Sequence, residues 1–118
     1  LYHLGSRGVE FDLLPWMQKL GMPMMAYCPL AQAGSLRRDL AGCAAVQNAA
    51  AAHGVSPWQV LLAFLLTRPG VYPIPRSSRA EHTLDNAAAL ELRLSAEELA
   101  ALDAAFPAPT RRTPLDIV

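Results

Sequence analysis

Short apolar runs alternate with helical segments along the chain, and no two runs are joined by the tight turn of a β-hairpin. The runs lie at residues 1–4, 23–27 and 71–74, and none of them has a helical period. Strands that alternate with helices in this way are parallel and are connected by right-handed crossovers. The order therefore predicts an α/β fold with three parallel strands.

Helical segments are expected at residues 9–20, 42–53, 56–68, 79–90 and 95–106. Ser56 is the expected N-cap of the third helix, with Pro at the first helical position, and Ser95 opens a capping box with Glu98. Pro15 is expected either to kink the first helix or to mark a shorter first turn. Residues 28–40 are expected to form a loop, and the tail from residue 108 onwards to be irregular.

Composition is typical of a helix-rich globular domain. The chain has 21 Ala and 19 Leu among its 118 residues, and Ala and Leu favour helices. Hydrophobic residues make up 53%, and 10 basic residues balance 10 acidic ones, which excludes a disordered or nucleic-acid-coating chain. The balanced charge therefore predicts no nucleic-acid partner, and no membrane is expected because no apolar run approaches the ~20 residues needed to cross a bilayer.

The two cysteines and the first residue suggest a compartment and a larger context. Cys28 and Cys43 lack metal-ligand spacing, and without a recognisable secretion signal they are expected to be reduced, which predicts a cytoplasmic location and no metal site. Three parallel strands would leave both sheet edges unpaired. Because the sequence also begins at Leu1 within an apolar run, we expect it to be part of a longer protein.

The loop that follows the second apolar run is the first candidate site, because ligands of parallel α/β folds bind at the carboxyl ends of strands. It contains Tyr27, Cys28, Leu30 and Gln32. An aromatic side chain at a strand end suits a flat ring stacked upon it, and a loop of small residues lets backbone amides approach an anion. The alternative interpretation is a core tyrosine followed by an ordinary turn.

The loop after the third apolar run is the second candidate site. Arg76 and Arg79 flank two hydroxyl groups, those of Ser77 and Ser78, just before a helix that carries His82 in its first turn. Guanidinium groups, hydroxyls and the positive end of a helix dipole are suited to holding a phosphate. The alternative is that the serines cap the helix and the arginines are solvated.

Several stretches of the chain resemble the C-terminal part of the aldo-keto reductase family, in the family's order and spacing. They are YHLGSRGVE at residues 2–10, MAYCPL at 25–30, HGVSPWQV at 53–60, IPRSS at 74–78 with EH at 81–82 and DN at 85–86, and LSAEEL at 94–99 with LD at 102–103. The resemblance implies a (β/α)8 TIM barrel, of which residues 1–118 would be the C-terminal segment with the last three strands and their helices. The upstream half of the same barrel is then the expected partner.

The same resemblance implies an NADPH site that includes the first loop. Tyr27 matches the tyrosine that stacks on the nicotinamide ring, and Cys28, Leu30 and Gln32 match the pyrophosphate-binding loop. No residue matches the family's catalytic tetrad of Asp, Tyr, Lys and His, so no catalytic residue and no metal ligand is assigned.

The resemblance also assigns the second loop to the cofactor. Arg76 stands where the family usually has Lys. This change keeps the positive charge but replaces the compact ammonium group with a planar guanidinium that has several N–H donors. Ser77 and Ser78 match positions that contact the 2′-phosphate, and His82 matches an Arg or His that reads this phosphate.

Asp85 and Asn86 match an acidic residue and an asparagine that contact the adenine; without the resemblance they would be interpreted as polar residues on a helix surface.

By resemblance, the full-length protein is expected to reduce a small-molecule carbonyl substrate, an aldehyde or ketone, to an alcohol with NADPH. Two alternatives stay open. One is a non-catalytic cofactor-binding or interaction subunit on the same barrel, which an upstream half without the tetrad would indicate. The other is a free-standing half-barrel that dimerises through apolar surface at Met24, Met25, Val71 and Ile74.

Overall fold

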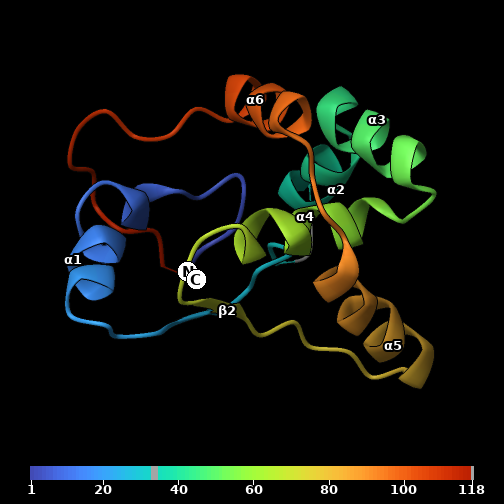
Figure 1. Ribbon diagram of the computed structural model, residues 1–118, viewed down its shortest axis with the longest axis horizontal. Helices are drawn as coiled ribbons and strands as arrows, with labels where there is room; N and C mark the ends of the chain where they lie inside the picture. The colour runs from blue at the N-terminus through green and yellow to red at the C-terminus, as the bar shows by residue number, and fades with distance from the viewer. Residues whose placement is uncertain (33–34, 118) are drawn as a thin grey trace.

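The computed structural model describes residues 1–32 and 35–117 (Figure 1). In chain order the elements are η1 (Gly8–Glu10), α1 (Leu13–Lys19), β1 (Met24–Ala26), α2 (Ser35–Gly42), α3 (Ala44–His53), α4 (Pro57–Leu66), β2 (Val71–Pro73), α5 (Ala80–Ala88), η2 (Ala89–Glu91) and α6 (Ala96–Ala105). Among the described residues, two strands joined by a helical crossover form one parallel pair, as the alternating pattern predicts.

The two strands expose one face of their sheet and bury the other. They pair in parallel, with Met25 beside Tyr72 at the centre of the register. Met24, Ala26 and Val71 are buried, whereas the side chains of Met25 and Tyr72 are 70% and 59% exposed. The face that carries Met25 is therefore open in the described structure, although parallel sheets are normally covered on both faces.

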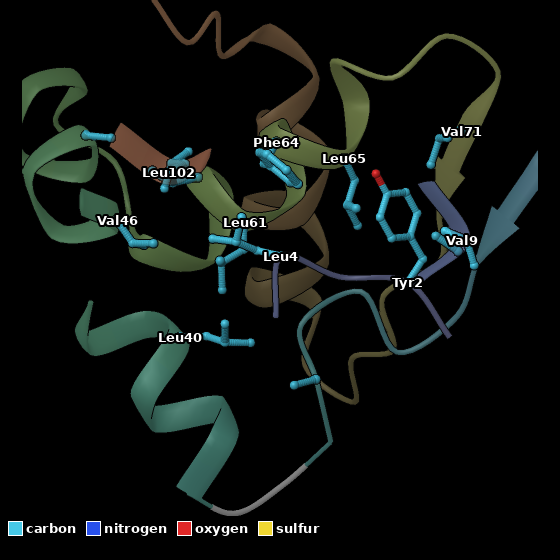
Figure 2. Close-up of a cluster of buried hydrophobic side chains, with 14 of the residues drawn as sticks. Tyr2, Leu4, Val9, Leu40, Val46, Leu61, Phe64, Leu65, Val71 and Leu102 are labelled. Carbon is cyan, nitrogen blue, oxygen red and sulfur yellow. The ribbon is translucent and has the colours of Figure 1, made fainter. Parts of the chain in front are cut away.

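Helix α4 lies at the centre of the hydrophobic core. It packs against α2, α3, α5 and β2, and six consecutive residues, from Val60 to Leu65, are buried. A helix that is apolar on all sides is one that neighbours surround. Figure 2 shows Leu61, Phe64 and Leu65 of this helix among buried side chains from both ends of the chain, such as Tyr2.

The predicted helix boundaries with strong capping signals are confirmed. The Ser56 hydroxyl accepts the backbone N–H of Gln59 while the Gln59 side chain accepts that of Ser56, and Ser95 and Glu98 form the same reciprocal box at α6. Helix α3 ends at Gly54, whose φ of +64° is the left-handed conformation that glycine adopts without strain.

The prediction of a strand at residues 1–4 is wrong for the described structure. The Tyr2 N–H reaches the Tyr27 carbonyl at 3.4 Å, next to the end of β1, but His3 and Ser6 pair with each other in an isolated antiparallel bridge. That bridge turns the backbone away before a ladder can continue, although Tyr2 and Leu4 are buried. The sheet therefore has two strands here instead of three.

The prediction of a loop at residues 28–40 is confirmed for residues 28–32 and is wrong from Ser35 onwards, where α2 begins; residues 33–34 lie outside the described residues. Leu40 and Ala41 are 0% and 9% exposed, and these two adjacent residues attach a helix that is otherwise mostly exposed. Two adjacent buried positions do not have the three- or four-residue spacing by which a helix is detected in a sequence. Cys43 then separates α2 from α3, so the second predicted helix begins at Ala44 and not at residue 42.

The segment at residues 9–20 is divided into η1 and α1. Pro15 is the third residue of α1, where its missing N–H is one of the donors that a helix start leaves unpaired. It therefore lies in the first turn, the second of the two alternatives. Among the described residues, no single helix is long and apolar enough to span a membrane; only the pair α3 and α4, bent by 95°, passes that test together.

A buried charge cluster ties the start of the chain to α6. Arg7 donates to both carboxylate oxygens of Glu10, at 2.9 and 2.7 Å, and to Asp103 at 2.7 Å. Glu10 also accepts the Tyr2 hydroxyl at 2.6 Å, and burial together with this bond raises the pKa of Tyr2. Burial opposes the charge of Arg7, but its bonds to the two carboxylates raise its pKa. The Arg7 guanidinium also lies 5.1 Å from the centre of the Phe64 ring.

The tail beyond α6 is irregular, as predicted, and returns to the first residues of the chain. The Arg112 Nε donates to Asp12 at 2.7 Å, and the Ser6 hydroxyl bonds to Asp116. These contacts bring the two ends of the chain together, as Figure 1 shows.

Candidate functional site

Two adjoining pockets open at the carboxyl ends of the two strands, and together they contain every residue predicted to bind the cofactor. The first, which we call the Tyr27 pocket, has a volume of about 500 Å³ and is lined by Tyr27, Cys28, Leu30, Gln32 and Arg76 among others. The second, the Ser77 pocket, has a volume of about 330 Å³ and is lined by Leu30, Arg76, Ser77, Ser78, His82, Asp85 and Asn86 among others. The segments that follow the two strands, residues 27–32 and 74–86, are thus brought together as the parallel topology predicts.

The Tyr27 pocket is formed by a backbone turn directly after β1. Cys28 and Ala31 both have positive φ, +52° and +58°, and the Ala31 N–H donates to the Cys28 carbonyl at 2.9 Å. Residues other than glycine rarely adopt this conformation, which costs about 1 kcal/mol or more. Tyr27 is half-buried on the pocket wall and is not part of the core cluster, so the core-tyrosine alternative is wrong.

The Ser77 pocket lies between β2 and the start of α5. Neither Ser77 nor Ser78 is the N-cap, contrary to the capping alternative, because α5 begins one residue after Arg79, which caps it without a side-chain bond. The Ser77 hydroxyl accepts the Arg79 N–H at 3.1 Å and donates to the Arg79 carbonyl at 2.9 Å. Ser78 is exposed at the pocket wall.

Arg79 lies outside the site, which corrects the expectation that two arginines converge beside the serines. Its side chain is 65% exposed and pairs with Glu81 on the surface. It lines neither pocket.

The two pockets are lined by two arginines and one acidic residue. Arg37 and Arg76 line both of them, His82 lines the Ser77 pocket, and Asp85 is the acidic residue on that wall. Within residues 1–32 and 35–117, neither Arg37 nor Arg76 has a carboxylate within ion-pair distance. Cations left without a protein counter-charge are suited to an anionic ligand.

Sequence reasoning did not identify three further residues on these walls: Arg37, Ser56 and Trp58. The guanidinium carbon of Arg37 lies 4.6 Å from the centre of the Trp58 ring, within the range of a cation–π contact. Arg37 stood in a region expected to be a loop, and Ser56 was interpreted only as a helix cap. The cap was a correct signal for α4 but gave no indication that α4 begins at the pocket.

Gln59 connects the start of α4 with α5. Its side chain completes the capping box with Ser56, and its Nε2 donates to the Asp85 carbonyl at 3.0 Å. One side chain thus fixes the distance between two walls of the Ser77 pocket. Among the described residues, no group of His, Cys, Asp and Glu side chains is placed to hold a metal ion.

Comparison with known proteins decides the family. The model of the family described as "Aldo/keto reductase family" matches residues 1–106. The chain belongs to the aldo/keto reductase family.

Individual relatives of this aldo/keto reductase chain match most or all of its length. Methylglyoxal reductase YeaE of Escherichia coli is 55% identical over 118 residues. The crystal structure of an aldo-keto reductase from Klebsiella pneumoniae in complex with NADPH has a TM-score of 0.94 and 53% identity and covers 100% of the chain. A thermostable aldo-keto reductase in complex with the inhibitor epalrestat covers 87% of the chain, with a TM-score of 0.74 and 35% identity.

The chain spans only part of these proteins. It covers 42% of the Escherichia coli reductase, 42% of the Klebsiella pneumoniae reductase and 37% of the thermostable enzyme. The described fold is accordingly a portion of a (β/α)8 barrel, as predicted, with two strands formed of the three expected.

Proposed function

We propose that this chain supplies much of the NADPH site of a whole aldo/keto reductase that reduces small aldehydes or ketones to alcohols. The observation that carries the proposal is the joined pair of pockets, with an aromatic wall at one end and hydroxyl, imidazole and guanidinium groups at the other. A dinucleotide with an extra phosphate has the same succession of parts: a flat ring, a diphosphate and a phosphorylated ribose.

The residues of the Tyr27 pocket would hold the reactive end of the cofactor. The Tyr27 ring would stack on the nicotinamide and fix which of its faces is presented, while the turn between Cys28 and Ala31 would direct backbone groups towards the diphosphate. When bound, NADPH supplies a hydride for the carbonyl carbon. The chain's own contribution is orientation, since none of its residues matches the catalytic tetrad of the family.

The residues of the Ser77 pocket would select NADPH over NADH. Arg76 can place a planar fork of donors on the 2′-phosphate, and Ser77, Ser78 and His82 add donors around it. Asp85 and Asn86 would border the adenine. Hydrogen bonds to a charged group contribute about 1.5–3 kcal/mol each, so the loss of Arg76 is expected to weaken the affinity for NADPH.

Relatives support the same proposal. The Klebsiella pneumoniae reductase was solved with NADPH, and a second structure from that organism, 52% identical, was solved with NADP and acetate. Because the Escherichia coli relative is a methylglyoxal reductase, methylglyoxal is the first carbonyl compound to assay.

The exposed sheet face supports an upstream partner within the same barrel. Met25, Tyr72 and Ile74 are 70%, 59% and 46% exposed, although a parallel sheet needs cover on both faces. We expect the remainder of the barrel to cover them. The alternative of a dimer through four apolar side chains loses two of them, because Met24 and Val71 are only 8% and 4% exposed.

The experiment compares NADPH and NADH binding to the full-length protein that contains this chain, before and after Arg76→Glu. We expect the wild-type protein to prefer NADPH, and the substitution to weaken NADPH by about tenfold or more while changing NADH far less. Isothermal titration calorimetry measures both constants.

Arg79→Glu is the matched control, because it makes the same charge change three residues away on a side chain that lines neither pocket. It should leave the preference for NADPH nearly unchanged. Equal affinities for the two cofactors in the wild-type protein and in both variants would contradict the proposal. NADPH oxidation with methylglyoxal then tests the reductase activity.

A further inference from the structure

Arg37 occupies a central place that the family resemblance did not assign to it. It lies in the first turn of α2, and with Leu30 and Arg76 it forms the wall that the Tyr27 pocket and the Ser77 pocket share. A ligand that extends from one pocket into the other must pass this wall. Its side chain is partly buried and has no carboxylate partner among the described residues.

Trp58 gives Arg37 a fixed support. The centre of the Trp58 ring lies 4.6 Å from the guanidinium carbon of Arg37. Trp58 is the second residue of α4, in its first turn. That turn is itself held by the reciprocal bonds between Ser56 and Gln59 and by the bond from Gln59 to the Asp85 carbonyl. α2, by contrast, buries only Leu40 and Ala41 among its described side chains. The contact between Arg37 and Trp58 therefore joins α2, which has few buried residues, to α4, which is held at the centre of the core.

We propose that Arg37, positioned by the ring of Trp58, binds the diphosphate bridge of the dinucleotide. The inference rests on the proposed function, which places the nicotinamide at Tyr27 and the 2′-phosphate beside Ser77 and Ser78. The middle of the cofactor then lies at the shared wall, where Arg37 meets it. A guanidinium stacked on an aromatic ring keeps its edge N–H groups available, so the contact with Trp58 and a contact with phosphate oxygens are compatible.

A diphosphate contact makes a prediction that a 2′-phosphate contact does not. NADPH and NADH share the diphosphate and differ only in the 2′-phosphate. Loss of Arg37 should therefore weaken both cofactors by the same factor, whereas loss of Arg76 should weaken NADPH selectively. The ratio of the two dissociation constants separates the two roles within one measurement.

The test measures NADPH and NADH binding to the full-length protein carrying Arg37→Ala. Both dissociation constants should rise by about tenfold, the size of one charge-assisted hydrogen bond, and their ratio should stay at the wild-type value. The salt dependence of binding should also decrease, because one cation no longer contacts phosphate. Arg38→Ala is the matched control, since Arg38 is the next residue of the same helix, is exposed and lines neither pocket.

Trp58 is a positioning residue and needs a test that a merely structural role would not satisfy. Trp58→Leu should weaken both cofactors by about two- to fivefold, the range of an exposed cation–π contact, and Trp58→Phe should restore most of that loss. In an Arg37→Ala background, Trp58→Leu should have no further effect on binding. This lack of additivity distinguishes support of Arg37 from general packing.

Three outcomes would overturn the inference while leaving the proposed function intact: binding unchanged in Arg37→Ala, an effect equal to that of Arg38→Ala, or a loss confined to NADPH. Additive losses from Arg37→Ala and Trp58→Leu would overturn the role of Trp58. If the wild-type protein itself binds neither NADPH nor NADH, the proposed function fails instead.

Discussion

Arginine side chains occur in two regions of this molecule with opposite surroundings. Arg7 is 6% exposed and is neutralised by Glu10 and Asp103 at 2.7–2.9 Å. Arg37 and Arg76 line open pockets and, within the described residues, face no carboxylate at ion-pair distance. The same residue type thus stabilises the fold in one place and leaves positive charge available to a ligand in the other.

The difference teaches which observation separates a structural arginine from a binding one. Exposure alone is insufficient, because Arg79 is exposed yet paired with Glu81. A cation that lines a cavity and has no carboxylate partner indicates a candidate for ligand binding, since such a cation adds little to the stability of the fold. Substitution in the buried charge cluster should therefore change stability and not cofactor binding, and substitution at the pockets should do the reverse.

The largest effect is expected for Arg7→Met. The substitution removes the cation that bonds to both oxygens of the mostly buried Glu10 and leaves it only the cation of Arg68 at 3.8 Å, and breaking a buried ion pair on one side costs about 3 kcal/mol. Urea unfolding of the full-length protein measures the loss. Arg76→Met makes the same change on an exposed side chain and should alter the free energy of unfolding by no more than about 0.5 kcal/mol. Equal losses in the two variants would break the comparison.

The second expected effect concerns pH and the buried His3. Burial lowers the pKa of His3 from its ordinary value of 6.5, and the ring accepts the Gly5 N–H at 3.1 Å. Below pH 6.5 the unfolded chain takes up a proton that the folded chain resists, so stability should fall by up to about 1.4 kcal/mol per pH unit.

His3→Asn tests this dependence, because the amide oxygen can still accept the Gly5 N–H but does not titrate. The fall in stability between pH 6.5 and 5 should become shallower in this variant, as measured by urea unfolding at each pH. His82→Asn, at the exposed rim of the Ser77 pocket, is the matched control for replacing a histidine. An unchanged pH profile in His3→Asn would contradict the assignment.

The smallest expected effect is at a pair of intermediate exposure, His53 and Glu98, which lie 2.9 Å apart between α3 and α6. The hydrogen bond from His53, followed by that from the Ser95 backbone, lowers the pKa of Glu98 below its ordinary 4.5. Glu98→Gln keeps the acceptor for the capping box and should cost about 0.5–1 kcal/mol at pH 7.

The sign of the pH dependence follows from the lowered pKa. The contribution of the Glu98 charge is present above pH 4.5 and is lost as the pH falls through the lowered value, so the difference between wild type and Glu98→Gln should close there. A difference that persists in acid would show that packing, not charge, is responsible.

The sequence predicted the parts of the fold that local chemistry determines. Ser56 and Ser95 begin helices because their hydroxyls pair with the following turn, and this pattern is visible within four residues. The strand at residues 1–4 was mispredicted because strand formation depends on a neighbour, and His3 pairs with Ser6 instead. α2 was missed because its two buried side chains, Leu40 and Ala41, are adjacent and show no helical period.

The candidate site divides in the same way. The loop motifs gave the residues that follow each strand, and the topology brings all ten of them to two adjoining pockets. Their roles toward the cofactor stay predictions. Arg37 and Trp58 could not be found from spacing, because they are 21 positions apart and meet only when α2 folds back towards α4.

The bond from Gln59 to the Asp85 carbonyl means that two neighbouring crossovers of the barrel do not shift independently. A change that loosened the first turn of α4 would also loosen its link to α5, and with it the spacing on which the proposed discrimination between NADPH and NADH depends. Substitution of Gln59 is therefore expected to change both stability and the proposed preference for NADPH, even though the role of its side chain is to connect α4 with α5.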